Sequence, residues 1–188
     1  MRVDELTAEC VGALSESEPR LAVRTVLERA VTDRTFVESL GSPTPGLNVL
    51  HHAADLTVLN VIWPPLVSLF PHNHLMWAAI GIYGGREVNT FYRRQGRAII
   101  PSGGKELAEG DVLLLGDDAI HAVDNPVRTY TGAIHVYGGD FFATPRSQWD
   151  ADTLKEAPYD IEAVREAFAV AERAVAANGA PRSTNARS

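Results

Sequence analysis

The sequence is poor in cysteine, in basic residues and in long apolar runs. Cys10 is the only cysteine among 188 residues, so an internal disulfide and a cysteine-based zinc site are both excluded. Lys and Arg number 17 against 24 Asp and Glu, a formal net charge of −7, which argues against binding to nucleic acid or anionic lipid. No apolar run approaches the ~18 residues of a membrane-spanning helix, and Met1–Glu5 lacks a signal-peptide pattern. We therefore expect a cytoplasmic protein that binds neither membrane nor nucleic acid.

Three zones of different texture divide the chain into an N-terminal helical segment at 1–45, a strand-rich barrel segment at 46–148 and a C-terminal segment at 149–188. The third zone has a helical pattern that ends near Asn178, and we expect the small and polar residues Gly179–Ser188 to be disordered. Apolar residues of the first zone recur at the three- and four-residue steps of a helix face; they are Leu21, Val23, Val26, Leu27, Ala30 and Val31.

The middle zone consists of short segments that are rich in β-branched and aromatic residues and are separated by Pro and Gly turns. Many short strands at such spacing indicate a β-sandwich or a β-barrel. The clearest strand segments are Leu56–Trp63, Ala78–Tyr83, Val112–Leu115 and Tyr130–Tyr137.

Two histidines of the middle zone are separated by one residue, in Pro71–His74. Because side chains alternate between the faces of a strand, His72 and His74 point to one side and Asn73 to the other. Two imidazoles on one face can share a metal ion. A second segment contains Gly110-Asp-Val-Leu-Leu-Leu-Gly, followed by His121 and, four residues later, Asn125.

Together these two segments resemble the two halves of the cupin metal motif. The resemblance implies a mainly β fold, the double-stranded β-helix or jelly-roll barrel, with α-helices flanking it at both ends. It also implies one divalent metal bound by His72, His74 and His121. Most cupins add a glutamate four or five residues after the second histidine, but Ala78 and Ala79 stand there. The expected ligand set is therefore three neutral imidazoles, which leaves coordination sites open.

Among cupins, a three-histidine ligand set resembles the thiol dioxygenase family, typified by cysteine dioxygenase and mercaptopropionate dioxygenase. The resemblance covers roughly Leu47–Arg146 and implies Fe(2+) as the cofactor. It also implies that His135 and Tyr137 form a catalytic pair beside the metal. The family's relay begins with a serine, but Ala133 occupies that place, so which residue orients His135 from outside stays open.

Candidate residues for binding the substrate are Arg146 and His52. The family's mammalian-type members hold the substrate carboxylate with an arginine on the strand before the first motif, but Val49–Ala54 contains none. Bacterial members use an arginine shortly after the relay tyrosine, and Arg146 stands nine residues after Tyr137. Its guanidinium would bind a carboxylate in bidentate fashion. His52 would line the mouth of the pocket.

The sequence thus predicts a non-haem Fe(II) dioxygenase that oxidises a small thiol to a sulfinic acid with O2. One alternative is a three-histidine cupin oxygenase that acts on a different chelating substrate, as in diketone carbon–carbon cleavage. Another is a non-catalytic cupin that binds a metal and a small ligand. The substrate, the native metal and the oligomeric state stay open, because three imidazoles accept iron, nickel, copper or zinc.

Overall fold

The computed structural model describes residues 1–42 and 44–178, so the disorder predicted for Gly179–Ser188 lies outside the described residues. Three helices precede the strands and one follows them: α1 (Val3–Ala13), α2 (Pro19–Ala30), α3 (Arg34–Ser39) and α4 (Ile161–Asn178). The strands are β1 (Gly46–His52), β2 (Thr57–Trp63), β3 (Ser68–Asn73), β4 (Ala78–Gly84), β5 (Arg86–Gln95), β6 (Ala98–Ala108), β7 (Val112–Leu115), β8 (Ile120–Asp124), β9 (Thr131–Tyr137), β10 (Ser147–Trp149) and β11 (Glu156–Pro158). None of the described helices combines the length and apolarity that crossing a membrane requires.

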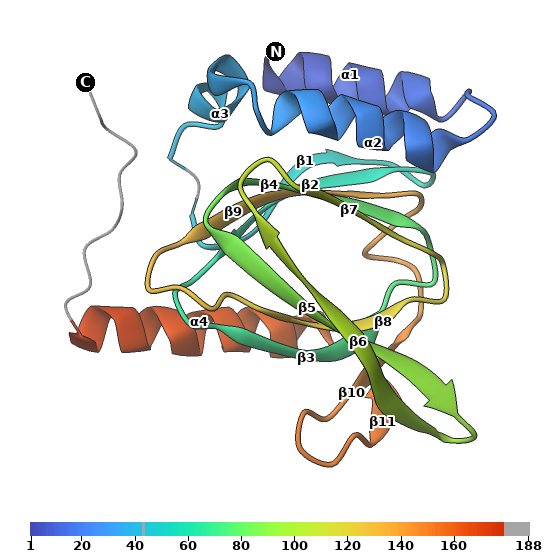
Figure 1. Cartoon of the computed structure of the whole chain (residues 1–188), viewed down its shortest axis with the longest axis vertical. Coiled ribbons are helices and arrows are strands. Elements are labelled where there is room, and N and C mark those ends of the chain that lie inside the picture. Colours follow the sequence, from blue (N-terminus) through green and yellow to red (C-terminus); the bar gives the residue numbers. More distant parts are fainter. Residues whose placement is uncertain (43, 179–188) are drawn as a thin grey trace.

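The strands form two antiparallel sheets, with the orders β1-β2-β9-β4-β7 and β11-β10-β3-β8-β5-β6, that face each other in Figure 1. The eight strands from β2 to β9 pair in a nested way: β2 with β9, β3 with β8, β4 with β7 and β5 with β6. A long hairpin folded over in this manner is a jelly roll. The predicted fold, a mainly β double-stranded β-helix with helices at both ends, is confirmed.

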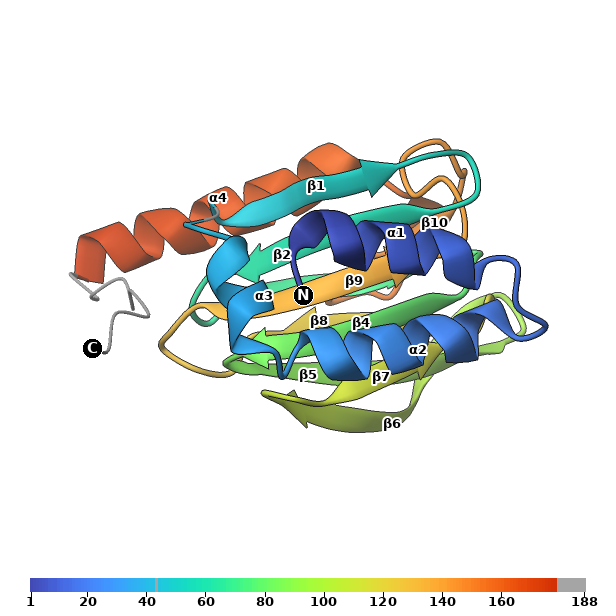
Figure 2. The same cartoon turned by 90° about the horizontal axis from the view of Figure 1, so that it is seen from above.

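The central strands β2, β9 and β4 of the five-stranded sheet are buried on both faces, because α1 and α2 lie across its outer side (Figures 1 and 2). Strands β2 and β9 and most of β4 are therefore buried along their length and mostly apolar, instead of alternating strictly with polar residues. β4 packs so closely against the C-terminal end of α2 that Gly81 has no room for a side chain. An added Cβ would lie only 2.7 Å from Val31 Cγ1. The outward residues that pack with the helices are Val58, Ala79, Ile134 and Val136.

Helix α4 packs against β3 on the other side of the barrel from α1 and α2 (Figure 1). Asp160 precedes the helix and its Oδ1 accepts a hydrogen bond from the Glu162 backbone N–H at 2.9 Å, as an N-cap residue does. The buried residues Val164 and Phe168 belong to the same apolar cluster as the barrel interior. The ring centroids of Phe168 and of Trp63 in β2 are 5.1 Å apart, so α4 contributes directly to the core.

Two short strands after the jelly roll extend the six-stranded sheet. β10 pairs with β3 at one position, Gln148 opposite His72, and β11 pairs with β10. The sheet thus continues past residue 148, where the predicted barrel segment ends. Arg94 Nη1 and Nη2 lie 2.9 and 2.7 Å from the two carboxylate oxygens of Glu156, and this pair joins β11 to β5.

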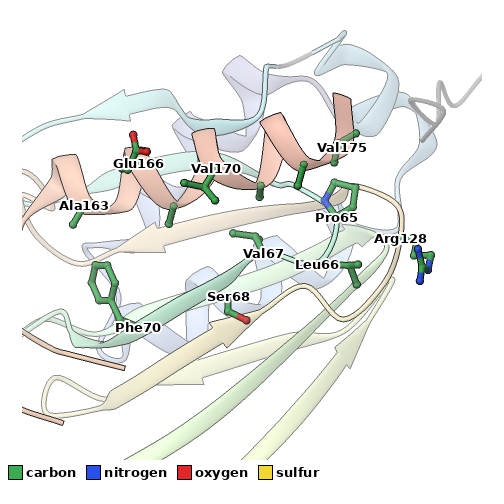
Figure 3. A pocket seen from close by; sticks show the side chains of 13 residues that line it. Pro65, Leu66, Val67, Ser68, Phe70, Arg128, Ala163, Glu166, Val170 and Val175 are labelled. Carbon is green, nitrogen blue, oxygen red and sulfur yellow. The ribbon is translucent and has the colours of Figure 1, made fainter. Parts of the chain in front are cut away.

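A surface groove of about 660 Å³ runs between α4 and the start of β3. Figure 3 shows Val170 and Val175 on the helix side and Leu66 and Val67 on the opposite side. Leu66 and Val170 are 56% and 52% exposed. The groove contains no cluster of ionisable side chains among the residues that line it, and its lining shares no residue with the cavity at the histidines.

Replacement of Phe168 by Ala should lower the free energy of unfolding by about 3–5 kcal/mol, the usual loss for a buried aromatic residue. The cause is the cavity left against Trp63. Val170→Ala on the exposed side of the same helix is the matched control, and its effect should stay within about 0.5 kcal/mol. Urea unfolding of both variants measures the difference; equal losses would mean that α4 does not pack into the core as described.

Candidate metal centre

Three buried histidines meet inside the barrel. In the pairing of β3 with β8, His72 lies directly opposite His121, and His74 follows one residue after β3 ends. The potential ligand atoms of the three side chains all lie within 4.8 Å of one another. Each of the three is at most 5% exposed. The structure therefore brings together the three residues that the sequence predicts as metal ligands.

The alternation of the strand separates the histidines from Asn73. The Asn73 side chain accepts a hydrogen bond from the Ser147 backbone N–H at 2.8 Å, so it faces β10. His72 and His74 line the interior cavity instead. The residue between the histidines thus attaches β10 to the sheet, and the sequence places the two imidazoles on one face as predicted.

Burial keeps the three imidazoles neutral. Desolvation, with a smaller contribution from the positive charge of Arg146, lowers the pKa of His72 to about 4. Desolvation and the repulsion between neighbouring imidazoles also hold the pKa values of His74 and His121 well below the ordinary value. Near neutral pH the ring nitrogens therefore keep the lone pairs that a metal requires.

The hydrogen bonds of the cluster leave nitrogen atoms free for a metal. The Nδ1 atoms of His72 and His121 contact the Phe70 carbonyl at 3.1 Å and Asn89 Oδ1 at 2.7 Å. Because both partners are acceptors, each Nδ1 carries the proton and each Nε2 carries the lone pair. Within the described chain, His121 Nε2 and His74 Nδ1 are buried with no hydrogen-bond partner. Unpaired buried nitrogens are costly, and a divalent cation bound by three imidazoles fits this arrangement.

His135 and Tyr137 lie beside the histidine cluster on β9. His135 Nδ1 is 3.0 Å from the Tyr137 hydroxyl oxygen, and the Tyr137 ring centroid is 4.9 Å from that of His74. Burial raises the pKa of Tyr137 above its ordinary value, so the hydroxyl stays protonated at neutral pH. The predicted pair is thus in hydrogen-bond contact next to the cluster, while its catalytic role stays a prediction.

Two buried polar residues of β5, Glu87 and Asn89, also lie next to the histidines. They were not predicted from the sequence. Asn89 Nδ2 donates to Glu87 Oε1 at 2.9 Å, and Glu87 Oε2 lies 3.7 Å from His135 Nε2. Both residues are 0% exposed. Their spacing of two residues places them on one strand face, which is the signal that could have singled them out. That spacing shows that Glu87 and Asn89 share a face, but the charged and polar residues along Arg86–Gln95 do not show that this face points inward.

The two residues predicted to bind the substrate, Arg146 and His52, do not line the cavity at the histidines. Arg146 is 8% exposed, and its guanidinium carbon lies 4.2 and 3.8 Å from the ring centroids of Phe141 and Tyr159. These two rings line the cavity at the histidines, whereas Arg146 does not. His52 does not line that cavity either: its side chain is 43% exposed and its Nε2 is 2.9 Å from Asp140 Oδ1. Substrate binding by Arg146 and His52 stays a prediction, and Tyr159 is a lining residue that was not predicted.

The cavity at the histidines is small, with a volume of about 20 Å³, close to the space that one water molecule needs. The surface groove beside α4 is far larger, but the cluster of potential metal ligands is at the small cavity. We therefore assign the candidate site to the small cavity.

His121→Ala should remove most of the bound metal, because a three-ligand site with no carboxylate in reserve is left with two imidazoles. His52→Ala, which removes an exposed histidine away from the cluster, should keep the wild-type metal content. Elemental analysis and titration of the purified apoproteins with a divalent metal compare the two. Wild-type affinity in His121→Ala would exclude His121 as a ligand.

Sequence comparison finds no matching family model and no matching curated protein. Solved structures do match. The protein BH2720 from Bacillus halodurans is 14% identical over 54% of this chain and 76% of its own, with a TM-score of 0.48. An RmlC-like cupin from Methanocaldococcus jannaschii is 12% identical over 54% of this chain and 86% of its own, with a TM-score of 0.44. A cupin superfamily protein from Desulfitobacterium hafniense is 17% identical, again over 54% of this chain and 86% of its own, with a TM-score of 0.43.

These similarities are too distant to carry an activity, and the fold assignment depends on the nested strand pairing. The chain has the cupin-type double-stranded β-helix, with helices at both ends and a cluster of three histidines inside the barrel.

Proposed function

We propose that this protein is a non-haem Fe(II) dioxygenase that oxidises a small thiol to a sulfinic acid with O2. The observation that carries the proposal is the convergence of His72, His74 and His121 without a carboxylate among the clustered groups, next to the His135–Tyr137 pair. Three neutral ligands leave the charge of a divalent ion uncompensated, which favours an anionic co-ligand such as a thiolate. The resemblance to thiol dioxygenases supports the same choice.

The overall reaction adds both oxygen atoms to sulfur, RSH + O2 → RSO2H, and needs no further reductant. Ferrous iron, when bound, would supply the redox chemistry. The protein contributes three fixed imidazoles, an interior largely closed to water and the Tyr137 hydroxyl. Tyr137 would form a hydrogen bond with the reacting groups, and its contact with His135 at 3.0 Å would hold the hydroxyl in place.

The size of the cavity bears on the substrate. A volume of about 20 Å³ does not hold even a small thiol, so lining side chains have to rearrange when a substrate enters, and we propose that Phe141 and Tyr159 move apart. Arg146 stacks over both rings, and within the described chain its buried Nε has no hydrogen-bond partner. Such a movement would open a path for a substrate carboxylate to the guanidinium, which supports the proposed role of Arg146 in binding a thiol acid.

Oxygen uptake by the iron-loaded protein tests the proposal. We expect uptake with one member of a panel of small thiols, and a sulfinic acid that mass spectrometry identifies with both oxygen atoms from labelled O2. Uptake with a β-diketone alone would instead favour the carbon–carbon-cleaving alternative. No uptake with any thiol or diketone would contradict a dioxygenase and favour a non-catalytic cupin.

Tyr137→Phe should retain metal at wild-type stoichiometry but lower turnover of the thiol by about ten- to a thousandfold, because it removes one oriented hydrogen-bonding group beside the reacting atoms. The removed hydroxyl is not one of the clustered ligand groups, so metal content serves as the internal control. Steady-state oxygen uptake measures the loss. Unchanged turnover in correctly metallated protein would leave Tyr137 with a packing role alone.

Arg146→Ala should raise the Michaelis constant for a thiol carboxylic acid by roughly ten- to a hundredfold, with little change for cysteamine, which has no carboxylate. Arg146→Lys should recover part of the loss, because it keeps the charge but not the planar fork. Arg146 also donates to the backbone carbonyl of Phe141, so thermal unfolding is measured in parallel. Equal losses with both thiols would assign Arg146 a purely structural role.

A further inference from the structure

Glu87 is a carboxylate placed inside the barrel without any cationic side chain in hydrogen-bond contact among the described residues. It is 0% exposed. Its Oε1 accepts from Asn89 Nδ2 at 2.9 Å, and its Oε2 faces His135 Nε2 at 3.7 Å. An ionised carboxylate can only accept hydrogen bonds. Asn89 therefore turns its NH2 donor toward Glu87. The contact with His135 is longer than a hydrogen bond, and its two atoms, Glu87 Oε2 and His135 Nε2, are both buried without a hydrogen-bond partner among the described residues. Because these two unpaired atoms face each other, a proton on His135 Nε2 is the electrostatically favoured arrangement.

One chain of contacts leads from Glu87 to a candidate metal ligand. Because Asn89 directs its NH2 group to Glu87, its carbonyl oxygen faces the other way and contacts His121 Nδ1 at 2.7 Å. His121 must then carry its proton on Nδ1, and its Nε2 keeps the lone pair. That Nε2 is the atom with no hydrogen-bond partner in the described chain. Glu87 thus determines, through Asn89, which nitrogen of His121 faces the cluster.

A second chain of contacts leads to Tyr137. If His135 directs an Nε2–H toward Glu87, its Nδ1 has no proton and accepts from the Tyr137 hydroxyl at 3.0 Å. The Tyr137 hydrogen is then committed to His135. The phenolic oxygen retains lone pairs for a donor in the cavity. Without Glu87, nothing in the described surroundings of His135 Nε2 would favour this tautomer over the opposite one.

We propose that Glu87 is the positioning residue of this centre, holding His121 through Asn89 and Tyr137 through His135 with its two oxygens. It would take the place left open by Ala133, where thiol dioxygenases carry the relay serine. A serine hydroxyl can donate or accept, whereas a carboxylate allows only one direction. The effect on turnover rests on the proposed function, but the proton positions on His135 and His121 do not.

Charge supports the same assignment. A carboxylate withdrawn from water is unfavourable unless a positive charge compensates it. Three imidazoles that bind through their lone pairs would bring no negative charge to a divalent ion. Glu87 lies two hydrogen bonds from His121. It can therefore offset part of the metal charge from outside the ligand set, in place of the carboxylate ligand that Ala78 and Ala79 do not supply.

Nitrogen-15 NMR of the histidine rings in the metal-free wild-type protein tests the inference directly. We expect the proton of His135 on Nε2 and that of His121 on Nδ1. A proton on His135 Nδ1 in the wild type would overturn the proposal. This measurement needs no variant, no metal and no thiol, so it stands even if the iron-loaded protein oxidises nothing, a result that would refute the proposed function alone.

Glu87→Gln provides the second arm, because an amide offers one acceptor where the carboxylate offers two. The tighter contact with Asn89 should keep the amide oxygen, so the amide NH2 turns to His135 and moves its proton to Nδ1. Turnover should fall by about ten- to a hundredfold, as for other residues that orient a metal site from outside, with KM for the thiol and the metal content near wild type. Glu87→Ala, which removes both contacts, should weaken metal affinity by about ten- to a hundredfold.

Glu106→Gln is the matched control, since Glu106 lies on the neighbouring strand β6 with a half-exposed side chain paired to Arg86. It should leave the histidine spectra, the metal affinity and the turnover unchanged. A folded Glu87→Gln protein with wild-type proton positions and wild-type turnover would show that Glu87 is only a structural residue.

Discussion

The candidate site depends above all on the register between β3 and β8. His72 lies opposite His121 in this pairing, and a slip of one residue would turn one of the two imidazoles to the outer face of the sheet. The apolar pair of Leu69 and Val123 lies further along the same two strands. The register shifts between this pair and the histidine pair, at a β-bulge or irregularity between Leu69 and His72. The shift allows both the apolar pair and the histidines to face the interior.

The barrel interior holds a polar path within an otherwise apolar core. Hydrogen bonds join His121 to Asn89, Asn89 to Glu87 and His135 to Tyr137, while Glu87 and His135 face each other at 3.7 Å without a hydrogen bond. Buried polar groups of this kind destabilise a fold unless their partners are in place. The Glu87–His135 contact is where this path crosses between the sheets, because β8 and β5 belong to one sheet and β9 belongs to the other.

A strand is easier to predict from the sequence when both of its faces are buried than when one face is exposed to solvent. β2, β4, β7 and β9 belong to the sheet that α1 and α2 cover, so their residues are mostly apolar and β-branched, and each was recognisable from composition alone. β5 and β6 have one largely exposed face and carry many charged residues, and they were not recognised. Since Glu87 and Asn89 lie on β5, the missing strand and the missing site residues have the same cause.

The sequence by itself determined the jelly-roll fold class, the flanking helices and the three clustered histidines. Strand alternation and short motifs are local properties, and the resemblance to cupins connected them. Only the tertiary structure decided that Glu87 and Asn89 point inward, that Arg146 stacks on Phe141 and Tyr159, and that His52 stays outside the cavity. A polar strand has no hydrophobic face to mark its interior side, and a loop residue such as Arg146 takes its position from distant partners. These placements arise from contacts between segments far apart in the chain, which no local pattern records.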